Sequence, residues 1–250
     1  MDDISLFFLL FVIYQTAFGL WAQLQIIKRG LPPVSFKKAS LRGTLSVILN
    51  TAVALLVAAA CKISVFGIIL INGKSVSVGL ALLILPFALT PLKARFKFYK
   101  QKKRGADHYP RTTPERMIWV FRSMVAAVGE EVFYRAVLFK ILLWWTGDYW
   151  LSAAISAMAF ALGHSATELV IIFETYFVAI GLQWLVEISG GLYLAIAVHF
   201  LHNVIVGILG GIMIKRRTAR EQAKVEVISA TTDHLSPATQ SAIATDITES

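Results

Sequence analysis

The sequence predicts an all-α polytopic membrane protein with about seven transmembrane helices. Three observations predict this fold class. The 250 residues are 57% hydrophobic and only 16% charged, whereas soluble domains carry about a quarter charged residues. Several apolar runs reach the length of about 20 residues that a helix needs to cross the hydrocarbon core. The charged residues gather between these runs, so each run is expected to be a separate span.

The first three expected spans lie in the N-terminal part of the chain. Residues 4–27 contain no charge; they are too long for the apolar part of a cleaved signal peptide and follow acidic rather than basic residues. The second span covers residues 43–61, and its apolar character allows it to continue past Lys62 to residue 71 as a long, tilted helix. The third span, 75–92, is short and contains Pro86, whose missing backbone donor predicts a kink.

Four further spans are expected at residues 117–146, 149–167, 169–186 and 188–214. The chain therefore divides into an N-terminal region of helices and basic loops (1–116), a core (117–214) and a tail (215–250). We expect the whole tail, 215–250, to be disordered, because the stretch after Arg220 is polar, rich in Ser, Thr and Ala, and aperiodic.

The distribution of lysine and arginine predicts the orientation of the spans. The loops after the first and third spans are strongly basic, whereas the loop after the second carries only Lys74. Because basic loops stay in the cytoplasm, we expect a multi-pass protein of the cell membrane with its N-terminus outside. The tail, which follows Lys215 and Arg216, is then cytoplasmic. Trp144 and Trp150 fall at the outer interface, where aromatic rings are favoured.

The net charge of +9 indicates the lipid bilayer as a partner and does not indicate nucleic acid. Most of the excess lies in short loops beside spans, where topology and anionic headgroups account for it. No nucleic-acid-binding motif accompanies it. Cys61 is the single cysteine, which excludes an intramolecular disulfide and a cysteine metal cluster.

Ionisable residues inside the later spans are the main functional signal, because each costs about 3 kcal/mol at mid-membrane. In the stretch GEEVFYR, Glu131 and Arg135 are four residues apart and share one helix face, whereas Glu130 is rotated by about 100°. Glu131 and Arg135 are expected to pair, either structurally or as part of a site. Glu130 lacks that partner, and in a low-dielectric cavity it is suited to act as a general base.

Two later spans add imidazoles and a carboxamide. The stretch FALGH ends at His164, and HFLHN places His199 and Asn203 four residues apart on one face. A single histidine within a span is often only a packing residue. A carboxylate, two imidazoles and an amide on three separate spans instead supply what a hydrolytic centre needs and what lipid contact penalises.

These three stretches resemble the motifs EExxxR, FxxxH and HxxxN/D of the CAAX protease and bacteriocin-processing (CPBP or ABI) family of intramembrane proteases. Each motif alone is weak, but here all three occur in order, each in an apolar span. The resemblance covers residues 117–213. It implies that the core region is an intramembrane protease built around a polar cavity.

The resemblance also implies an activity. The prenyl-protein proteases of this family cleave isoprenylated CaaX C-termini, and other members are associated with bacteriocins. The expected partner is therefore a peptide or a lipidated protein. Glu130 resembles the glutamate that activates water, and His164 the histidine that assists it. His199 and Asn203 resemble the pair that stabilises the oxyanion. Glu131 and Arg135 resemble the ion pair that supports these site residues.

Two chemistries remain open for such a site. Glutamate-activated water requires no cofactor. In a metalloprotease, His164, His199 and a carboxylate would instead hold Zn²⁺ and leave a position for water. The sequence lacks the HExxH helix that makes a zinc prediction specific, and asparagine is an uncommon zinc ligand. These two points favour activated water.

Two other function classes fit part of the pattern. Buried acids also mark ion pathways, as in an ion-coupled transporter, but the sequence shows no paired repeats or broken helices in corresponding positions. A non-catalytic immunity or scaffold protein of the same family, which keeps the motifs for packing, is the main alternative to a protease.

The expected depths of two site residues disagree. Glu130 lies about 20 Å of helix beyond Arg116, whereas His164 lies near the inner end of its span. We therefore expect either that the stretch after Pro114 begins at the membrane interface, or that the turn after His164 dips into the membrane.

Overall fold

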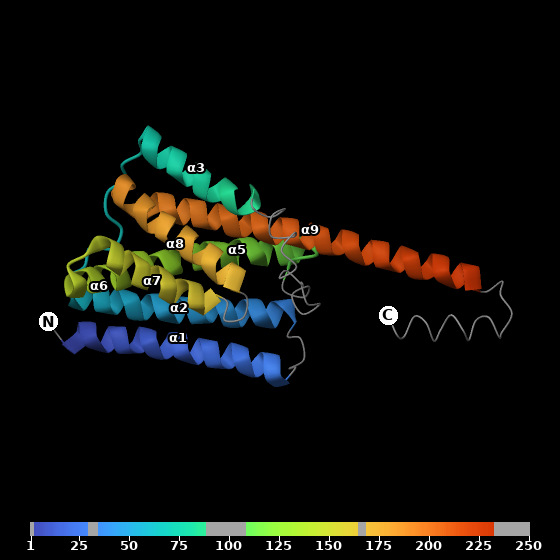
Figure 1. Cartoon of the computed structure of the whole chain (residues 1–250), viewed down its shortest axis with the longest axis horizontal. Helices are drawn as coiled ribbons and strands as arrows, with labels where there is room; N and C mark the ends of the chain where they lie inside the picture. The colour runs from blue at the N-terminus through green and yellow to red at the C-terminus, as the bar shows by residue number, and fades with distance from the viewer. Residues whose placement is uncertain (1–2, 30–34, 89–108, 165–168, 233–250) are drawn as a thin grey trace.

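The computed structural model describes residues 3–29, 35–88, 109–164 and 169–232, which form a bundle of helices (Figure 1). In chain order the elements are α1 (Asp3–Arg29), α2 (Phe36–Ala60), α3 (Gly73–Ala88), α5 (Thr113–Glu130), η2 (Glu131–Leu138), α6 (Phe139–Thr146), α7 (Tyr149–His164), α8 (Leu169–Ser189) and α9 (Tyr193–Thr232). The segment η2 is π-helical and continues directly from α5 into α6. The predicted all-α class is confirmed, and the described residues form seven helical segments when α5, η2 and α6 count as one.

Four of the described helices are long and apolar enough to cross a membrane. They are Asp3–Gln25, Phe36–Ala60, Ile171–Ser189 and Tyr193–Arg220, and α3 is a shorter apolar helix. Large apolar side chains such as Phe7, Leu56 and Phe177 point away from the bundle, which is unfavourable in water but favourable in lipid. The chain is a polytopic membrane protein.

The core lies where η2 meets the first two helices. Phe8 of α1, Ala54 and Val57 of α2, and Val132 and Val137 of η2 are buried in one hydrophobic cluster. Helix α5 packs between α2 and α9, while α7 packs against α8. The π-helical segment therefore lies inside the bundle, among the helices that carry the candidate site residues.

The second span differs from its prediction at both ends. Helix α2 begins at Phe36, ahead of the predicted residue 43, and ends at Ala60. The chain turns at Cys61 and Lys62, where Lys62 takes a φ of 53°, and residues 63–72 are not helical. A continuation of this helix to residue 71 is therefore wrong, because the turn at Lys62 ends it.

The extended segment after α2 packs on the turn between α8 and α9. Gly67 forms an isolated antiparallel bridge with Gly191, and Ile68 N–H donates to the Gly190 carbonyl at 3.0 Å. Gly190 has a φ of +72°, and a Cβ there would lie 3.1 Å from the Ile68 carbonyl oxygen. Both the backbone conformation and the close approach favour glycine. This pairing closes the end of the bundle at which the N-terminus lies (Figure 1).

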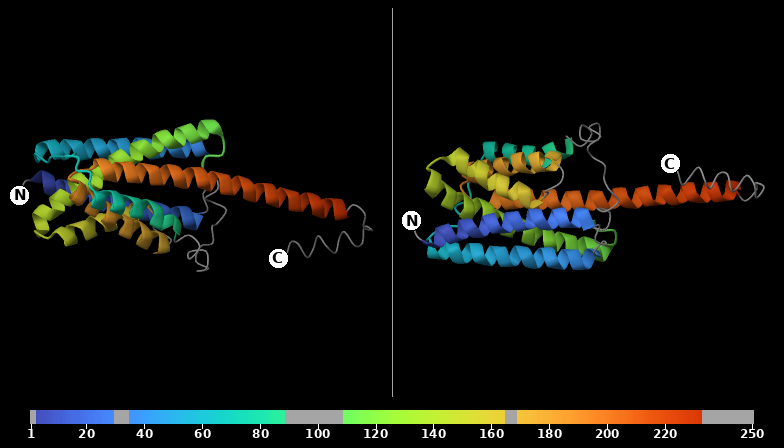
Figure 2. Two further views of the ribbon diagram at one scale, coloured as in Figure 1. Left: turned by 90° about the horizontal axis from the view of Figure 1, so that it is seen from above. Right: turned by 60° about the horizontal axis from the view of Figure 1, so that its bottom comes forward.

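Helix α9 is longer than predicted. It begins at Tyr193 rather than 188 and continues to Thr232, so its second half extends away from the bundle (Figure 2). Residues 215–232 are therefore helical, which corrects the prediction of a disordered tail for this part. Residues 233–250 lie outside the described residues, as do the predicted span ends at 89–92 and 165–167 and the basic loop at 93–108.

Candidate active site

The π-helical segment η2 carries the EEVFYR stretch beyond its first residue, Glu130. The N–H of Phe139 donates to the Tyr134 carbonyl, five residues back, which is the bonding pattern of a π-helix. The same carbonyl accepts from the Ser156 hydroxyl of α7 at 2.8 Å. Short π-helical insertions within α-helices are frequent at functional sites. The Ser156 contact ties α7 to this segment.

The predicted ion pair is present and deeply buried. The Glu131 side chain is fully buried, and its Oε2 lies 3.3 Å from Arg135 Nε. Its other oxygen, Oε1, lies 2.8 Å from His199 Nδ1. The Arg135 guanidinium lies over the Phe160 ring, 4.3 Å from its centroid. Glu131 therefore joins η2 to α9, and Arg135 joins η2 to the FALGH stretch of α7.

Glu130 has different surroundings from its neighbour. Its Oε2 lies 3.5 Å from His164 Nε2 and 3.6 Å from His199 Nε2. The Glu130 side chain is 18% exposed and that of His164 is 40% exposed. One carboxylate thus faces two imidazoles, of which His164 is the more exposed.

Hydrogen bonds at Nδ1 orient both imidazoles. His164 Nδ1 lies 2.8 Å from the Phe160 carbonyl, which can only accept, so this nitrogen carries the hydrogen. His199 Nδ1 in turn donates to Glu131. Both rings therefore direct Nε2 at Glu130.

Asn203 lies one turn beyond His199 on α9 and is half-buried. Its backbone carbonyl accepts a hydrogen bond from Trp119 Nε1 at 2.8 Å. Its carboxamide makes no hydrogen bond with another described residue. The side-chain donor is thus available to a substrate, while the backbone contact holds this part of α9 against α5.

Two aromatic residues belong to the site and were missed from the sequence. The Tyr134 ring meets the Phe160 ring edge-on at 5.1 Å and 85°, and a Cβ on Gly163 would lie 3.6 Å from the Tyr134 hydroxyl. Tyr134 follows Glu130 by four residues, a spacing that could have identified it. Trp119 gave no such signal, because its partner is a backbone carbonyl.

Glu130 and His164 lie in contact, although the sequence predicts different depths for them. Helix α5 begins ahead of the predicted span, since the Thr112 side chain caps it by accepting from Glu115 N–H at 3.4 Å. The N–H groups of Arg111 and Thr112 donate to the Glu115 carboxylate and hold its pKa below the usual value. The turn after His164 lies outside the described residues.

The zinc alternative requires three protein ligands close together. In the described part of the chain, no group of three or more His, Cys, Asp or Glu side chains is arranged to hold a metal ion. Glu131 is also engaged by Arg135 and His199.

Comparison with known proteins gives one match. Residues 112–205 match the model of the family described as "Type II CAAX prenyl endopeptidase Rce1-like". The matched region contains every candidate site residue, namely Glu130, Glu131, Arg135, His164, His199 and Asn203. No curated protein and no solved structure matches the chain. Residues 112–205 therefore form a domain of the Rce1-like type II CAAX prenyl endopeptidase family, also known as the CPBP or ABI family.

Proposed function

We propose that this protein is an intramembrane endopeptidase in which Glu130 activates a water molecule. One observation carries the proposal. A single oxygen of Glu130 faces two imidazole nitrogens at 3.5 and 3.6 Å, and within the described residues it has no hydrogen-bond partner. Such a carboxylate is unfavourable inside a membrane protein unless it has a function.

The proposed reaction uses the site residues in two steps. Glu130 takes a proton from water, and the water oxygen bonds to the carbonyl carbon of the substrate to give a tetrahedral oxyanion. The Asn203 carboxamide and a protonated His199 Nε2 donate to that oxyanion. The carbon–nitrogen bond then breaks, and the proton held by Glu130 passes to the leaving nitrogen, with His164 assisting both transfers.

Glu131 and Arg135 act as positioning residues in this proposal. Glu131 fixes the ring orientation of His199 through Nδ1, and Arg135 holds Glu131 in place. A buried partner of this kind controls which nitrogen of a histidine faces the reaction. The side-chain burial of both residues supports this role.

The proposed substrates are peptides or lipidated proteins that reach the site from the membrane. Prenylated CaaX C-termini and bacteriocin-like peptides are the two classes to compare. We also propose that the N-terminus lies outside and that the C-terminal part of α9 lies in the cytoplasm, because the basic segments then follow the positive-inside rule.

The test is cleavage of quenched fluorescent peptides, prenylated and unprenylated, by detergent-purified protein. Glu130→Gln removes the base while preserving shape, and we expect a loss of roughly 1,000-fold or more. Glu187→Gln is the matched control, since Glu187 is an exposed glutamate at the end of α8, and it should leave the rate unchanged. Metal content is measured on all three proteins.

Each outcome has a clear meaning. Cleavage that survives Glu130→Gln contradicts the proposed mechanism, and cleavage that depends on a bound metal contradicts the cofactor-free reaction. If all three proteins are folded and inactive on every peptide, the non-catalytic immunity or scaffold function replaces the peptidase.

A further inference from the structure

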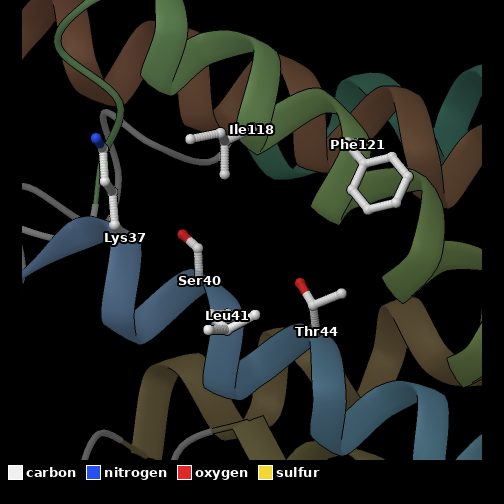
Figure 3. A pocket seen from close by; sticks show the side chains of 6 residues that line it. All are labelled: Lys37, Ser40, Leu41, Thr44, Ile118 and Phe121. Atoms are coloured by element: carbon white, nitrogen blue, oxygen red, sulfur yellow. The ribbon is translucent and has the colours of Figure 1, made fainter.

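A cavity of about 270 Å³ lies between α2 and α5, away from the candidate active site. Its lining consists of Lys37, Ser40, Leu41 and Thr44 of α2 and Ile118 and Phe121 of α5 (Figure 3). The four α2 residues follow the spacing of one helix face, and the two α5 residues are three apart on the facing helix. None of the six candidate site residues lines this cavity.

The floor of the cavity carries a hydroxyl that lacks a partner. Ser40 is 2% exposed, and its Oγ has no hydrogen-bond partner within the described residues. Ser40 Oγ and the Thr44 hydroxyl both point into the space between the helices (Figure 3). A buried hydroxyl is normally satisfied by the protein, by water or by a ligand. The cavity therefore presents polar groups that a ligand could pair.

The walls and the rim have a different character from the floor. Leu41 and Phe121 are apolar and more than half exposed, at 61% and 65%, so the cavity has apolar sides that open outward. Lys37 is exposed and its ammonium group lies at the edge of the same space (Figure 3). Helix α2 begins at Phe36 as a candidate membrane span, which places Lys37 where a span meets the headgroup region.

We propose that this cavity binds an anionic glycerophospholipid of the surrounding bilayer. Its phosphate accepts hydrogen bonds from Lys37, Ser40 and Thr44, and the start of an acyl chain lies against Leu41, Ile118 and Phe121. A cation and two hydroxyls match a phosphate, and adjacent apolar walls match an attached chain. The site is independent of the peptidase function, since no residue is shared.

The test is a titration of the detergent-purified full chain, followed by native mass spectrometry. The ligands are phosphatidylglycerol, phosphatidylcholine with the same acyl chains, and glycerol phosphate. Phosphatidylglycerol should bind more tightly than phosphatidylcholine, and Lys37→Ala should weaken its binding about fivefold. Lys38→Ala is the matched control, because Lys38 is an exposed neighbour outside the lining, and it should have no effect.

Three results would overturn the proposal. If Lys37→Ala and Lys38→Ala weaken phosphatidylglycerol binding equally, the lipid is attracted by diffuse surface charge and not by this cavity. If both phospholipids bind equally tightly, the site does not recognise an anionic headgroup. If glycerol phosphate binds as tightly as the lipid, the acyl chain does not contribute to binding.

Ser40→Leu fills the cavity and should abolish specific binding. If this variant fails to fold, Thr44→Val takes its place and should weaken binding. Glu130→Gln should bind lipid like the parent chain.

Discussion

Glu130 and Glu131 show how one position along a helix decides the function of a carboxylate. Glu131 is engaged on both oxygens, by Arg135 and by His199. Glu130 faces two imidazoles at longer distances and keeps some exposure. Glu131 lies beside a permanent cation and makes a short contact with His199, which suits a structural role, whereas the less buried Glu130 faces only imidazoles and can exchange protons with a water molecule. The same substitution is therefore expected to affect stability mainly at Glu131 and peptidase activity mainly at Glu130.

Glu131→Gln should reduce the free energy of unfolding by about 3–5 kcal/mol, because it leaves the buried Arg135 guanidinium without its counter-charge. The measurement is reversible denaturation in detergent micelles, followed by intrinsic tryptophan fluorescence. Glu130→Gln is the control and should change stability far less, since Glu130 has no short ion pair. Equal destabilisation by the two variants would show that Glu130 is also a structural residue.

Asn203→Ala should lower kcat by roughly 100-fold to 1,000-fold and leave KM nearly unchanged. The proposed carboxamide donor interacts with the oxyanion, which exists only in the transition state. The fold should be preserved, because Trp119 bonds to the backbone carbonyl of this residue and not to its side chain. A raised KM with an unchanged kcat would instead place the carboxamide in ground-state binding.

At the scale of single elements, the sequence predicted the helices of the site better than their internal geometry. The four-residue spacing of Glu131 and Arg135 correctly predicted their pairing. The regular α-helical repeat behind that argument does not hold, since the pair lies in a π-helical segment. Its hydrogen bonds depend on tertiary contacts such as that of the Ser156 hydroxyl with the Tyr134 carbonyl, and a residue pattern within one helix contains no such information.

The packing of α5 on α9 depends on a missing side chain. A Cβ on Gly207 would overlap the Trp119 indole, whose Nε1 also bonds to the Asn203 carbonyl. Gly207→Ala should therefore lower the Tm and reduce peptidase activity together, because α5 must move away from α9. Gly19→Ala is the matched control: a Cβ there meets nothing within 4 Å, and the better helix propensity of alanine should leave stability equal or slightly higher. An unchanged Tm in Gly207→Ala would contradict this packing.

For the molecule as a whole, composition predicted the membrane class and the number of helical segments. It misplaced the C-terminal ends of α2 and α9. The apolar run past Lys62 was expected to be helical, yet it pairs with the turn near Gly190, and hydropathy does not distinguish these two environments. The start of the polar tail was expected to be disordered, yet it continues α9. Its Lys, Arg, Gln, Glu and Ala residues are strong helix formers, a signal that an argument from polarity overlooks.

The site residues could be predicted because each motif is a short stretch of sequence. The contacts between the motifs depend on the tertiary fold. Three stretches in order predicted the residue types, and the structure places both His164 and His199 within 3.6 Å of Glu130. The opening of the site could not be predicted in this way. It depends on where α7 ends, and His164 is both its last residue and the most exposed member of this group.

The orientation of the bundle decides from which side a substrate enters. Helix α7 runs toward the end of the bundle at which α5 begins, and it ends at His164, beside Glu130 at the last residue of α5 (Figure 1). If basic segments stay inside, the end at which α5 begins faces the cytoplasm, whereas Lys74 in the first turn of α3 faces outward. Lys74→Cys and Arg220→Cys, each made with Cys61→Ala, test this with a membrane-impermeant maleimide. In intact cells only Lys74→Cys should react, and permeabilised cells should label both. The reverse pattern would place the mouth of the site outside and would exclude cytoplasmic CaaX proteins as substrates, while leaving the proposed hydrolytic chemistry intact.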